Sequence, residues 1–314
     1  TLLRYREHLK LSQFVTSWKE HIRPETRWMH PTFKLHGTVT GRLSCTDPNL
    51  QQVPRDPTIR ALITAPPGWV LVEADYSQVE LRVAAALSRD KTMRRVFQTG
   101  GDIHTTTAMT ITGLPEDQVT KDMRKRAKAV NFGFVYGMGA HKFRQYAKVK
   151  YDVELTEEEA RHFRERFFEL FSELPVWHDR QRRFVKAHNY VRTPIGRIRH
   201  LPEVMSSDKG VRAEAERQSV NSPVQSAASD LNLFAAIRIS EAFPNEVRII
   251  GTVHDAILME VRESKISEIL PEIKRIMEDR DAVSDVFGWD IPIPLEVEVK
   301  VGPWGKGEVY QPTK

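Results

Sequence analysis

The feature that most constrains the fold is a pair of apolar runs that each end in an aspartate. Trp69-Val-Leu-Val-Glu-Ala precedes Asp75, and Val247-Arg-Ile-Ile-Gly-Thr-Val precedes His254 and Asp255. Short apolar runs rich in β-branched residues and bounded by turn residues are typical of strands. Because the two aspartates lie about 180 residues apart, strand-forming segments come from both halves of the chain.

A long helical segment separates these runs. Residues 100–175 are predicted to be almost entirely helical, with Thr120 as a helix cap and a Thr156-x-x-Glu159 capping box. Pro175 suits the first turn of a further helix. The order sheet, helical insertion, sheet predicts an α+β chain, with the insertion as a second lobe.

The flanking segments complete this prediction. We expect a helix up to about residue 30, loops and short strands from 31 to 67, and a turn at 193–197 before a short strand. A long helix with a polar face should follow. The last part predicts a strand-turn-strand hairpin around Asp255, a helix from 263 to 277 and a strand from 294 to 301.

Composition sets broad limits. A chain of 314 residues can bury one large core or two. Its formal net charge of +5 and pI near 9.2 favour a polyanionic partner, although the excess is modest. The single cysteine, Cys45, excludes an internal disulfide and a multi-thiolate metal site. No apolar run approaches a membrane span of about 20 residues, and the first residues lack a signal-peptide core, so we expect a soluble, cytoplasmic protein without a membrane partner.

Cationic and aromatic residues recur at every fourth position within the helical insertion. Such spacing places residues on one side of a helix. Positive charge suits a triphosphate and a ring suits a base, but a solvated basic face and ordinary core packing remain the alternatives. The stripe consists of Arg124, Lys128, Phe132 and Tyr136.

The two strand-end aspartates suggest metal-assisted chemistry. Two divalent ions can hold the attacking and leaving oxygens of a phosphoryl transfer, and Mg²⁺ needs only one or two carboxylates plus substrate phosphates. Aspartates also often cap helices or occupy turns, which is the alternative for Asp75 and Asp255 taken singly.

Several motifs in order resemble family A DNA polymerases of the bacterial DNA polymerase I type. They span nearly the whole chain, and a series in the right order is far more specific than any one motif. They are Thr40-Gly-Arg-Leu-Ser44, Asp47-Pro-Asn-Leu-Gln51, Asp75-Tyr-Ser-Gln-Val-Glu-Leu-Arg82, Asp102-Ile-His104, Arg124-x-x-x-Lys128-x-x-x-Phe132-Gly-x-x-Tyr136-Gly137, Arg217-x-x-x-Asn221-x-x-x-Gln225 and Val253-His-Asp255.

The resemblance implies a right-hand polymerase fold, with an antiparallel palm sheet and a helical fingers insertion. Residues 1–98 would form the N-terminal part of the palm, with a truncated junction to the thumb at 1–30. Residues 99–205 would form the fingers and 206–314 the C-terminal part of the palm. The thumb would be largely absent, and a thumb and proofreading nuclease segment ahead of Thr1 would be a further partner.

The resemblance also implies an activity, the template-directed addition of deoxynucleotides to a primer 3′-hydroxyl with release of pyrophosphate. The partners would be primer-template DNA and dNTPs. The cofactor would be two Mg²⁺ ions, with Mn²⁺ as a substitute, and the ligands would be Asp75, Asp255 and the backbone oxygen of Tyr76.

Further residues take roles by the same resemblance. Lys128 would also protonate the departing pyrophosphate, and Glu80 would exclude ribonucleotides beside the sugar C2′. The nucleotide-binding residues are Arg124, Lys128, His104, Phe132, Tyr136, Glu80 and Gln78, and the DNA-binding residues are Arg42, Arg217, Asn221, Gln225 and His254.

Some features leave alternatives open. Ser77-x-x-Glu80 is also a capping box. Gly133 and Gly137 would be costly inside a helix, which suggests room for a ligand or a moving helix. Ala256 replaces the glutamate that the family usually has after His-Asp. One rival function is a single-subunit RNA polymerase, which shares the palm-and-fingers plan, although Glu80 and Phe132-Gly133 match the DNA-synthesising branch. The other is a non-catalytic DNA-binding remnant, which the expected lack of a thumb and Ala256 suggest.

Overall fold

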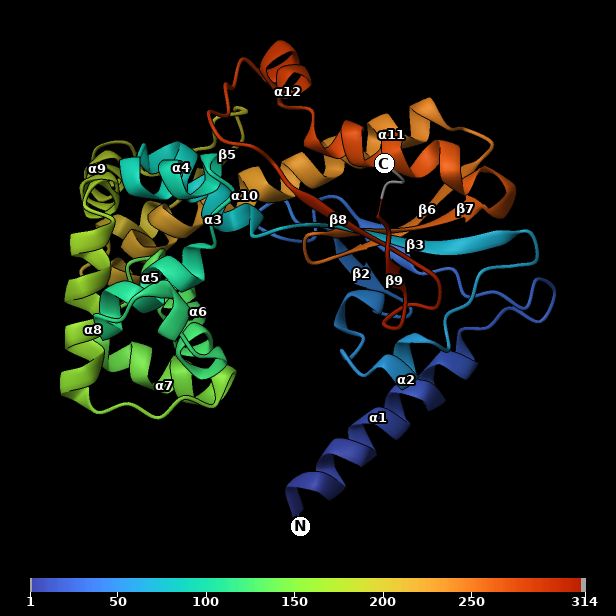
Figure 1. Ribbon diagram of the computed structural model, residues 1–314, viewed down its shortest axis with the longest axis horizontal. Helices are drawn as coiled ribbons and strands as arrows, with labels where there is room; N and C mark the ends of the chain where they lie inside the picture. Colours follow the sequence, from blue (N-terminus) through green and yellow to red (C-terminus); the bar gives the residue numbers. More distant parts are fainter. Residues whose placement is uncertain (1, 312–314) are drawn as a thin grey trace. The chain divides into compact units, whose positions relative to one another are not determined.

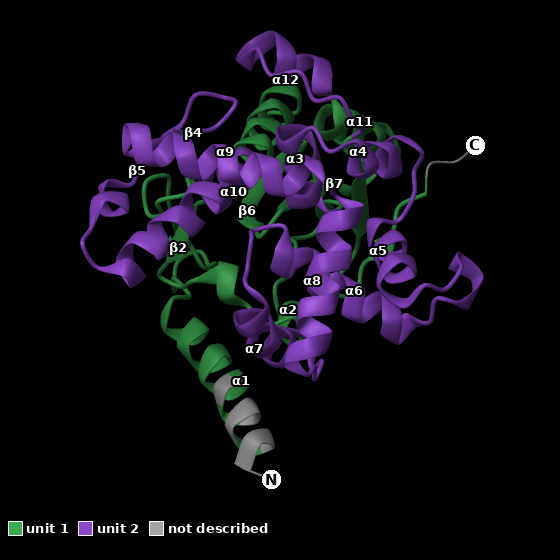
Figure 2. Ribbon diagram, turned by 90° about the vertical axis from the view of Figure 1, so that its left-hand side faces the viewer, with its two compact units in different colours: residues 1–77, 229–279, 295–314 green, residues 78–228, 280–294 purple. Residues whose placement is uncertain are grey.

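The computed structural model describes residues 2–311, apart from the side chains of residues 2–4, 6–8 and 10. The chain forms two compact units, which are coloured separately in Figure 2. Unit 1 contains residues 1–77, 229–279 and 295–314, and unit 2 contains residues 78–228 and 280–294.

Unit 1 is built on a five-stranded antiparallel sheet, in the order β6-β7-β3-β8-β9. The predicted strands and the hairpin around Asp255 are confirmed, and β3 at the centre of the sheet joins the two distant parts of the sequence. The strands are β3 (Trp69–Tyr76), β6 (Val247–Val253), β7 (Ala256–Arg262), β8 (Val297–Val301) and β9 (Glu308–Val309). The last long strand therefore begins at Val297 and not at Pro294, which lacks an N–H group for the ladder.

Helices and a small sheet complete unit 1. The Tyr76 hydroxyl donates to the Met277 carbonyl at 2.7 Å, which ties β3 to α11 (Ile266–Glu278; Figure 1). A buried cluster formed by Trp18, Val53, Leu71, Val253, Leu258 and Trp304 joins α1 to the sheet. The other elements are α1 (Leu2–Glu20), β1 (Thr32–Lys34), β2 (Ser44–Thr46), η1 (Leu50–Gln52), α2 (Pro57–Arg60) and η4 (Glu263–Lys265).

The N-terminal helix is shorter than predicted. It ends at Glu20, and Ile22 forms a bridge with Met29 across a tight turn. Pro24 has no N–H group for a helical hydrogen bond and disfavours a helical residue before it, so the helix cannot extend to residue 30.

Unit 2 is mostly helical, as the sequence predicts. Thr120 caps α6 through the Met123 N–H, and Thr156 and Glu159 form the predicted reciprocal capping box at the start of α8. The elements are α3 (Val79–Ser88), α4 (Lys91–Gln98), α5 (Ile103–Thr112), η2 (Glu116–Gln118), α6 (Lys121–Phe134), α7 (Ala140–Tyr151), α8 (Glu157–Leu170), α9 (Glu173–His188), β4 (Tyr190–Arg192), β5 (Ile198–His200), η3 (Pro202–Met205) and α12 (Arg280–Phe287). The predicted turn at 193–197 joins β4 to β5, whereas α12 was not predicted.

Aromatic packing holds the helices of unit 2 together. The Phe134 ring of α6 lies 4.3 Å from the Phe143 ring of α7 and 5.7 Å from the Phe167 ring of α8, between ring centroids. All three side chains are almost completely buried. These contacts fix α6, which carries Arg124, Lys128 and Phe132 of the predicted stripe, against two neighbouring helices.

Gly133 and Gly137, next to stripe residues in the sequence, are explained by the local structure and not by the predicted room for a ligand or a moving helix. Gly137 lies outside the helix, because α6 ends at Phe134. Its φ of +71° and its N–H bond to the Phe134 carbonyl at 2.8 Å are typical of a glycine after a helix C-terminus. At Gly133, a Cβ atom would lie 2.6 Å from the Phe143 ring, so close helix packing explains this glycine.

The long helix α10 (Lys209–Ala242) runs from unit 2 into unit 1 and contains Pro223. It confirms the predicted polar-faced helix. Within the described part of the chain, no helix has the length and apolar character needed to cross a membrane.

Candidate functional site

The sheet of unit 1 brings the two strand-end aspartates together. In the antiparallel pairing of β3 with β7, Asp75 lies opposite Ala256, the residue after Asp255. The Tyr76 N–H donates to the Asp255 carbonyl at 3.4 Å. His254, with a φ of +58°, forms the tight turn between β6 and β7. Residues from distant parts of the chain are therefore neighbours at one end of the sheet.

Charged residues surround Asp75 on the same face. Glu298 on β8 lies directly opposite Asp75, and Lys300 lies opposite Glu73 and binds Glu298, with 2.5 Å between Nζ and Oε1. Partial loss of hydration raises the pKa of Asp75 to about 6, and Glu73 and Glu298 act in the same direction against Lys300. Because Asp75 keeps an exposed surface, a cation can still reach this negative site.

The donor set suits a hard divalent cation. The carboxylates of Asp75 and Asp255 and the main-chain carbonyl of Tyr76, the predicted ligands, would all offer oxygen atoms, which Mg²⁺ prefers. No group of three or more His, Cys, Asp and Glu side chains among the described residues forms a closed metal cage. An open arrangement fits an ion that also binds water and substrate phosphates. Ala256 is buried and offers no side-chain oxygen.

Arg42, a predicted DNA-binding residue, lies beside this site. Its Nη2 atom is 3.8 Å from Asp255 Oδ1, and both side chains are partly exposed. His254 is exposed to solvent. The structure thus brings the residues predicted for metal and primer binding within unit 1 close together in the fold.

In unit 2, Arg124 is bound by a carboxylate that the sequence analysis did not select. Its Nε and Nη2 atoms lie 2.6 Å and 3.2 Å from the two carboxylate oxygens of Asp102. Asp102 also caps α5 through the backbone N–H groups of His104 and Thr105. Partial burial alone would raise the pKa of Asp102, but hydrogen bonds from Arg124 and Thr105 outweigh it and lower the pKa to about 2. An incoming anion must therefore share Arg124 with Asp102.

His104 is buried beside the stripe on α6. Its ring centroid lies 5.9 Å from that of Phe132, and its Nδ1 atom lies 2.8 Å from the Asn131 amide nitrogen. Burial lowers the pKa of His104 to about 4, with Arg124 and Lys128 acting in the same direction against Asp102. The imidazole is therefore neutral at pH 7, while Arg124 and Lys128 on α6 are exposed cations.

Tyr136 lies in the turn after α6, and not on the helix as predicted. Its hydroxyl donates a very short hydrogen bond to Glu80 Oε2. The predicted capping box does not describe the start of α3, because the residue at the N-cap position is Gln78, with a φ of +56° and no side-chain cap hydrogen bond. Glu80, in the first turn of α3, instead accepts the hydrogen bond from Tyr136 of the stripe.

The predicted DNA-binding residues on α10 lie on one side of the helix. Arg217, Asn221 and Gln225 are partly exposed, whereas the intervening Val220 and Val224 are buried. Arg217 Nε binds Glu214 Oε2 at 3.1 Å. The amide oxygens of Asn221 and Gln78 are buried and have no hydrogen-bond partner among the described residues. Such groups are unusual in folded proteins and are often completed by water or a ligand.

Comparison with known proteins decides the family. The family model described as DNA polymerase family A matches residues 1–306. The chain belongs to DNA polymerase family A. It is 39% identical over 307 residues to the thermostable DNA polymerase I of Thermus filiformis and 35% identical over 311 residues to DNA polymerase I of Geobacillus stearothermophilus. Each match covers 96% of this chain, but only 35% and 34% of those relatives.

A solved structure of a family A relative has the same fold. The POL domain of Pol1 from M. smegmatis, in complex with DNA primer-template and dNTP, matches with a TM-score of 0.88 and 33% identity. The match covers 98% of this chain and 53% of that one. This agreement confirms the predicted α+β polymerase fold, whereas the boundaries of palm and fingers stay a prediction.

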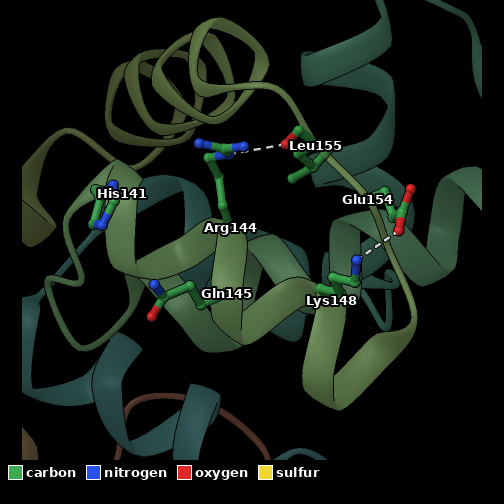
Figure 3. A pocket seen from close by; sticks show the side chains of 6 residues that line it. All are labelled: His141, Arg144, Gln145, Lys148, Glu154 and Leu155. Atoms are coloured by element: carbon green, nitrogen blue, oxygen red, sulfur yellow. Dashed lines mark hydrogen bonds and ion pairs between the residues drawn. The ribbon is translucent and has the colours of Figure 1, made fainter.

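Two hollows on unit 2 of this family A chain lie away from the predicted site residues. One, of about 340 Å³, lies along α7, and the residues that line it include two bonded pairs, Arg144 with the Leu155 carbonyl and Lys148 with Glu154 (Figure 3). Another of similar volume includes Trp177 and Phe184 of α9 in its lining. Neither contains a predicted site residue, so these two hollows do not mark the predicted site.

Sequence reasoning missed three residues that contact the predicted site residues or the helix that carries them. Asp102 holds Arg124, Asn131 contacts His104, and His178 Nε2 lies 2.9 Å from the carbonyl of Val135 at the end of α6. Asp102 lay within a quoted motif, and Asn131 lies directly before Phe132. No sequence signal marks His178, because a histidine on α9 can contact α6 only through the tertiary fold.

Proposed function

We propose that this chain carries the catalytic centre of a template-directed DNA polymerase, which adds deoxynucleotides to a primer 3′-hydroxyl and releases pyrophosphate. Membership of family A and the solved relative in complex with primer-template DNA and dNTP support this proposal. The observation that carries it is the pairing of β3 with β7, which makes Asp75 and Asp255 neighbours.

In unit 1, Asp75, Asp255 and the Tyr76 carbonyl would hold two Mg²⁺ ions, and Mn²⁺ would substitute for them. When bound, such ions lower the barrier by neutralising charge on the attacking and leaving oxygens. Arg42, 3.8 Å from Asp255, offsets the negative charge of the carboxylates and faces the primer-template DNA together with His254.

In unit 2, Arg124, Lys128 and neutral His104 would bind the triphosphate. Lys128 is exposed and can give a proton to the departing pyrophosphate. Phe132 would lie against the sugar and base. Tyr136 and Glu80, joined by their hydrogen bond, would close the space beside the sugar C2′, with Gln78 next to them in the chain.

The long helix α10 would contact the primer-template. Arg217, Asn221 and Gln225 can donate to the minor-groove acceptors that every correct base pair offers at similar positions, so they would test pair geometry and not sequence. We assign residues 1–98 and 206–314 to the palm and 99–205 to the fingers.

A primer-extension assay with Mg²⁺ tests the proposal. Asp75→Asn and Asp255→Asn should each abolish extension while leaving DNA affinity within a few-fold, because Lys and Arg contacts to phosphates supply most of the non-specific binding. Asp285→Asn, a change at an exposed aspartate on α12, is the matched control and should extend normally. DNA binding without extension by the unaltered chain would favour the non-catalytic alternative.

A further inference from the structure

A hydrogen-bonded chain of buried polar groups ends at His104. The Thr107 hydroxyl donates to Asn131 Oδ1 at 2.9 Å, and Asn131 Nδ2 lies 2.8 Å from His104 Nδ1. Thr107 and Asn131 are completely buried, and His104 is 2% exposed. The groups come from α5 and α6, so the chain forms only when these two helices pack together.

The orientation of the Asn131 amide follows from a backbone carbonyl. The Ile103 carbonyl lies 3.5 Å from Asn131 Nδ2, and a carbonyl can only accept a hydrogen bond. Rotating the amide by 180° would place two oxygens against each other. The nitrogen therefore faces Ile103 and His104, and the oxygen faces the Thr107 hydroxyl.

This orientation determines the tautomer of His104. An amide N–H donates, so Nδ1 must accept and cannot carry a proton. In a neutral imidazole the proton then lies on Nε2, which becomes a donor. Within the described residues, Nε2 forms no hydrogen bond, and the ring lies beside Phe132.

We propose that Asn131 is a positioning residue that fixes His104 as its neutral Nε2–H tautomer, so that the imidazole donates a hydrogen bond to a phosphate oxygen of the nucleotide. The nature of the acceptor rests on the proposed function, but the tautomer does not. The opposite tautomer would present a lone pair to an anion and repel it.

His104 does not gain a second N–H donor by protonation at neutral pH. Burial, together with Arg124 and Lys128, keeps the pKa of His104 at about 4 although Asp102 opposes this. The residue thus adds directional hydrogen bonding, while Arg124 and Lys128 supply charge. A neutral donor also lets the two cations approach the same phosphates without a third positive charge between them.

The tautomer can be measured directly. Long-range ¹⁵N–¹H correlation spectra of the ¹⁵N-histidine-labelled protein at pH 7 separate the two neutral tautomers by the shifts of the ring nitrogens. We expect His104 as Nε2–H. An Nδ1–H spectrum of the unaltered protein would overturn the proposal, and this measurement needs no variant.

The variant Asn131→Asp tests whether Asn131 sets the tautomer of His104. The side chain keeps its shape, but a carboxylate can only accept, so His104 Nδ1 should become protonated in this variant. His178 is the internal control, because its Nε2–H donates to the Val135 carbonyl at 2.9 Å and should be unchanged. A folded variant in which His104 remains Nε2–H would show that Asn131 does not set the tautomer. Thr107→Val, which removes only the hydroxyl that orients the amide, should give a mixture of tautomers and is the second variant if Asn131→Asp does not fold.

Kinetics test the phosphate contact separately. In steady-state extension at a pH where the spectra show His104 of Asn131→Asp neutral and protonated on Nδ1, this variant should raise the KM for dNTP about tenfold and change kcat less, because the Nε2–H donor to the bound triphosphate is lost. An unchanged KM together with a changed tautomer would overturn the phosphate contact. Failure of the unaltered chain to extend any primer would instead contradict the proposed polymerase function and leave the tautomer result in place.

Discussion

Among single residues, the buried histidines show most clearly how environment sets chemistry. His104 and His178 are each 2% exposed, and in both cases burial lowers the pKa to about 4. His104 Nδ1 lies 2.8 Å from the Asn131 amide nitrogen, whereas His178 donates from Nε2 to the Val135 carbonyl and holds the end of α6. The same residue type thus has a structural role at His178 and a proposed binding role at His104.

His178 should make the stability of the protein depend on pH. Its pKa is about 6.5 when unfolded and about 4 when folded, so as the pH falls below 6.5 only the unfolded chain takes up a proton. The stabilising contribution is present above pH 6.5 and is lost as the pH falls towards 4. His178→Gln keeps an N–H donor but does not titrate, so between pH 7 and 5 the unaltered protein should lose about 2 kcal/mol more unfolding free energy than the variant. Denaturant melts at several pH values measure this, and parallel curves for the two proteins would contradict it.

The Tyr136–Glu80 hydrogen bond should control the choice of sugar. Glu80→Ala should narrow the ratio of deoxy to ribo kcat/KM, because the space beside C2′ opens. Tyr136→Phe keeps the ring but removes the donor to Glu80, so it should narrow the ratio by a smaller factor. Single-nucleotide incorporation with dATP and ATP gives both ratios. Equal ratios in all three proteins would mean that Glu80 does not face the sugar.

At the scale of elements, the position of α6 is set by close packing. Gly133 touches the Phe143 ring of α7, the Phe134 ring lies between α7 and α8, and His178 of α9 binds the C-terminal turn. Three helices therefore determine where the predicted nucleotide-binding residues lie.

Gly133→Ala should destabilise the protein although alanine favours helices by about 1 kcal/mol. The added Cβ would lie 2.6 Å from the buried Phe143 ring, and overpacking of this kind costs about 1–3 kcal/mol. Chemical denaturation measures the loss. The double variant Gly133→Ala with Phe143→Leu should be more stable than the sum of the single changes predicts, because the smaller side chain makes room. Additive effects would mean that Phe143 is not the obstacle.

At the scale of the whole molecule, the formal net charge of +5 is modest, so the proposed DNA binding would depend on individual cations at the contact surface and not on a general positive field. Many basic side chains among the described residues are already paired with carboxylates, as Arg217 is with Glu214. Binding to phosphate would exchange such pairs for DNA contacts.

Salt dependence should separate Arg217 from an ordinary surface arginine. If Arg217 contacts a phosphate, Arg217→Gln should reduce the magnitude of the slope of log K against log salt by about 0.9. Arg275→Gln on α11 is the matched control, because Arg275 forms the same three-residue-spaced pair with Glu272 and has no predicted role. Fluorescence anisotropy with a labelled primer-template duplex measures the slopes. Equal slopes for both variants would remove Arg217 from the phosphate-binding residues.

The sequence by itself determined the local structure and the chemical types at the site. Apolar runs predicted β3 and the β6–β7 hairpin, capping residues predicted the starts of α6 and α8, and motif order predicted the family. These features depend on neighbours in the chain, where period and turn chemistry act directly. The chemistry of Asp75, Asp255 and Arg124 could be named from residue type, although their roles in catalysis stay predictions.

Only the tertiary structure decided which partners those residues have. The register of β3 with β7 places Asp75 beside Asp255. The packing of α5 on α6 brings Asp102 into contact with Arg124, and His104 into contact with Asn131. The fold also brings His178 within hydrogen-bonding distance of the Val135 carbonyl. The structure also showed that α1 and α6 end earlier than predicted, and that close packing against Phe143 explains Gly133. Side-chain partners, pKa values and tautomers depend on groups distant in sequence, and only packing brings those groups within hydrogen-bonding range.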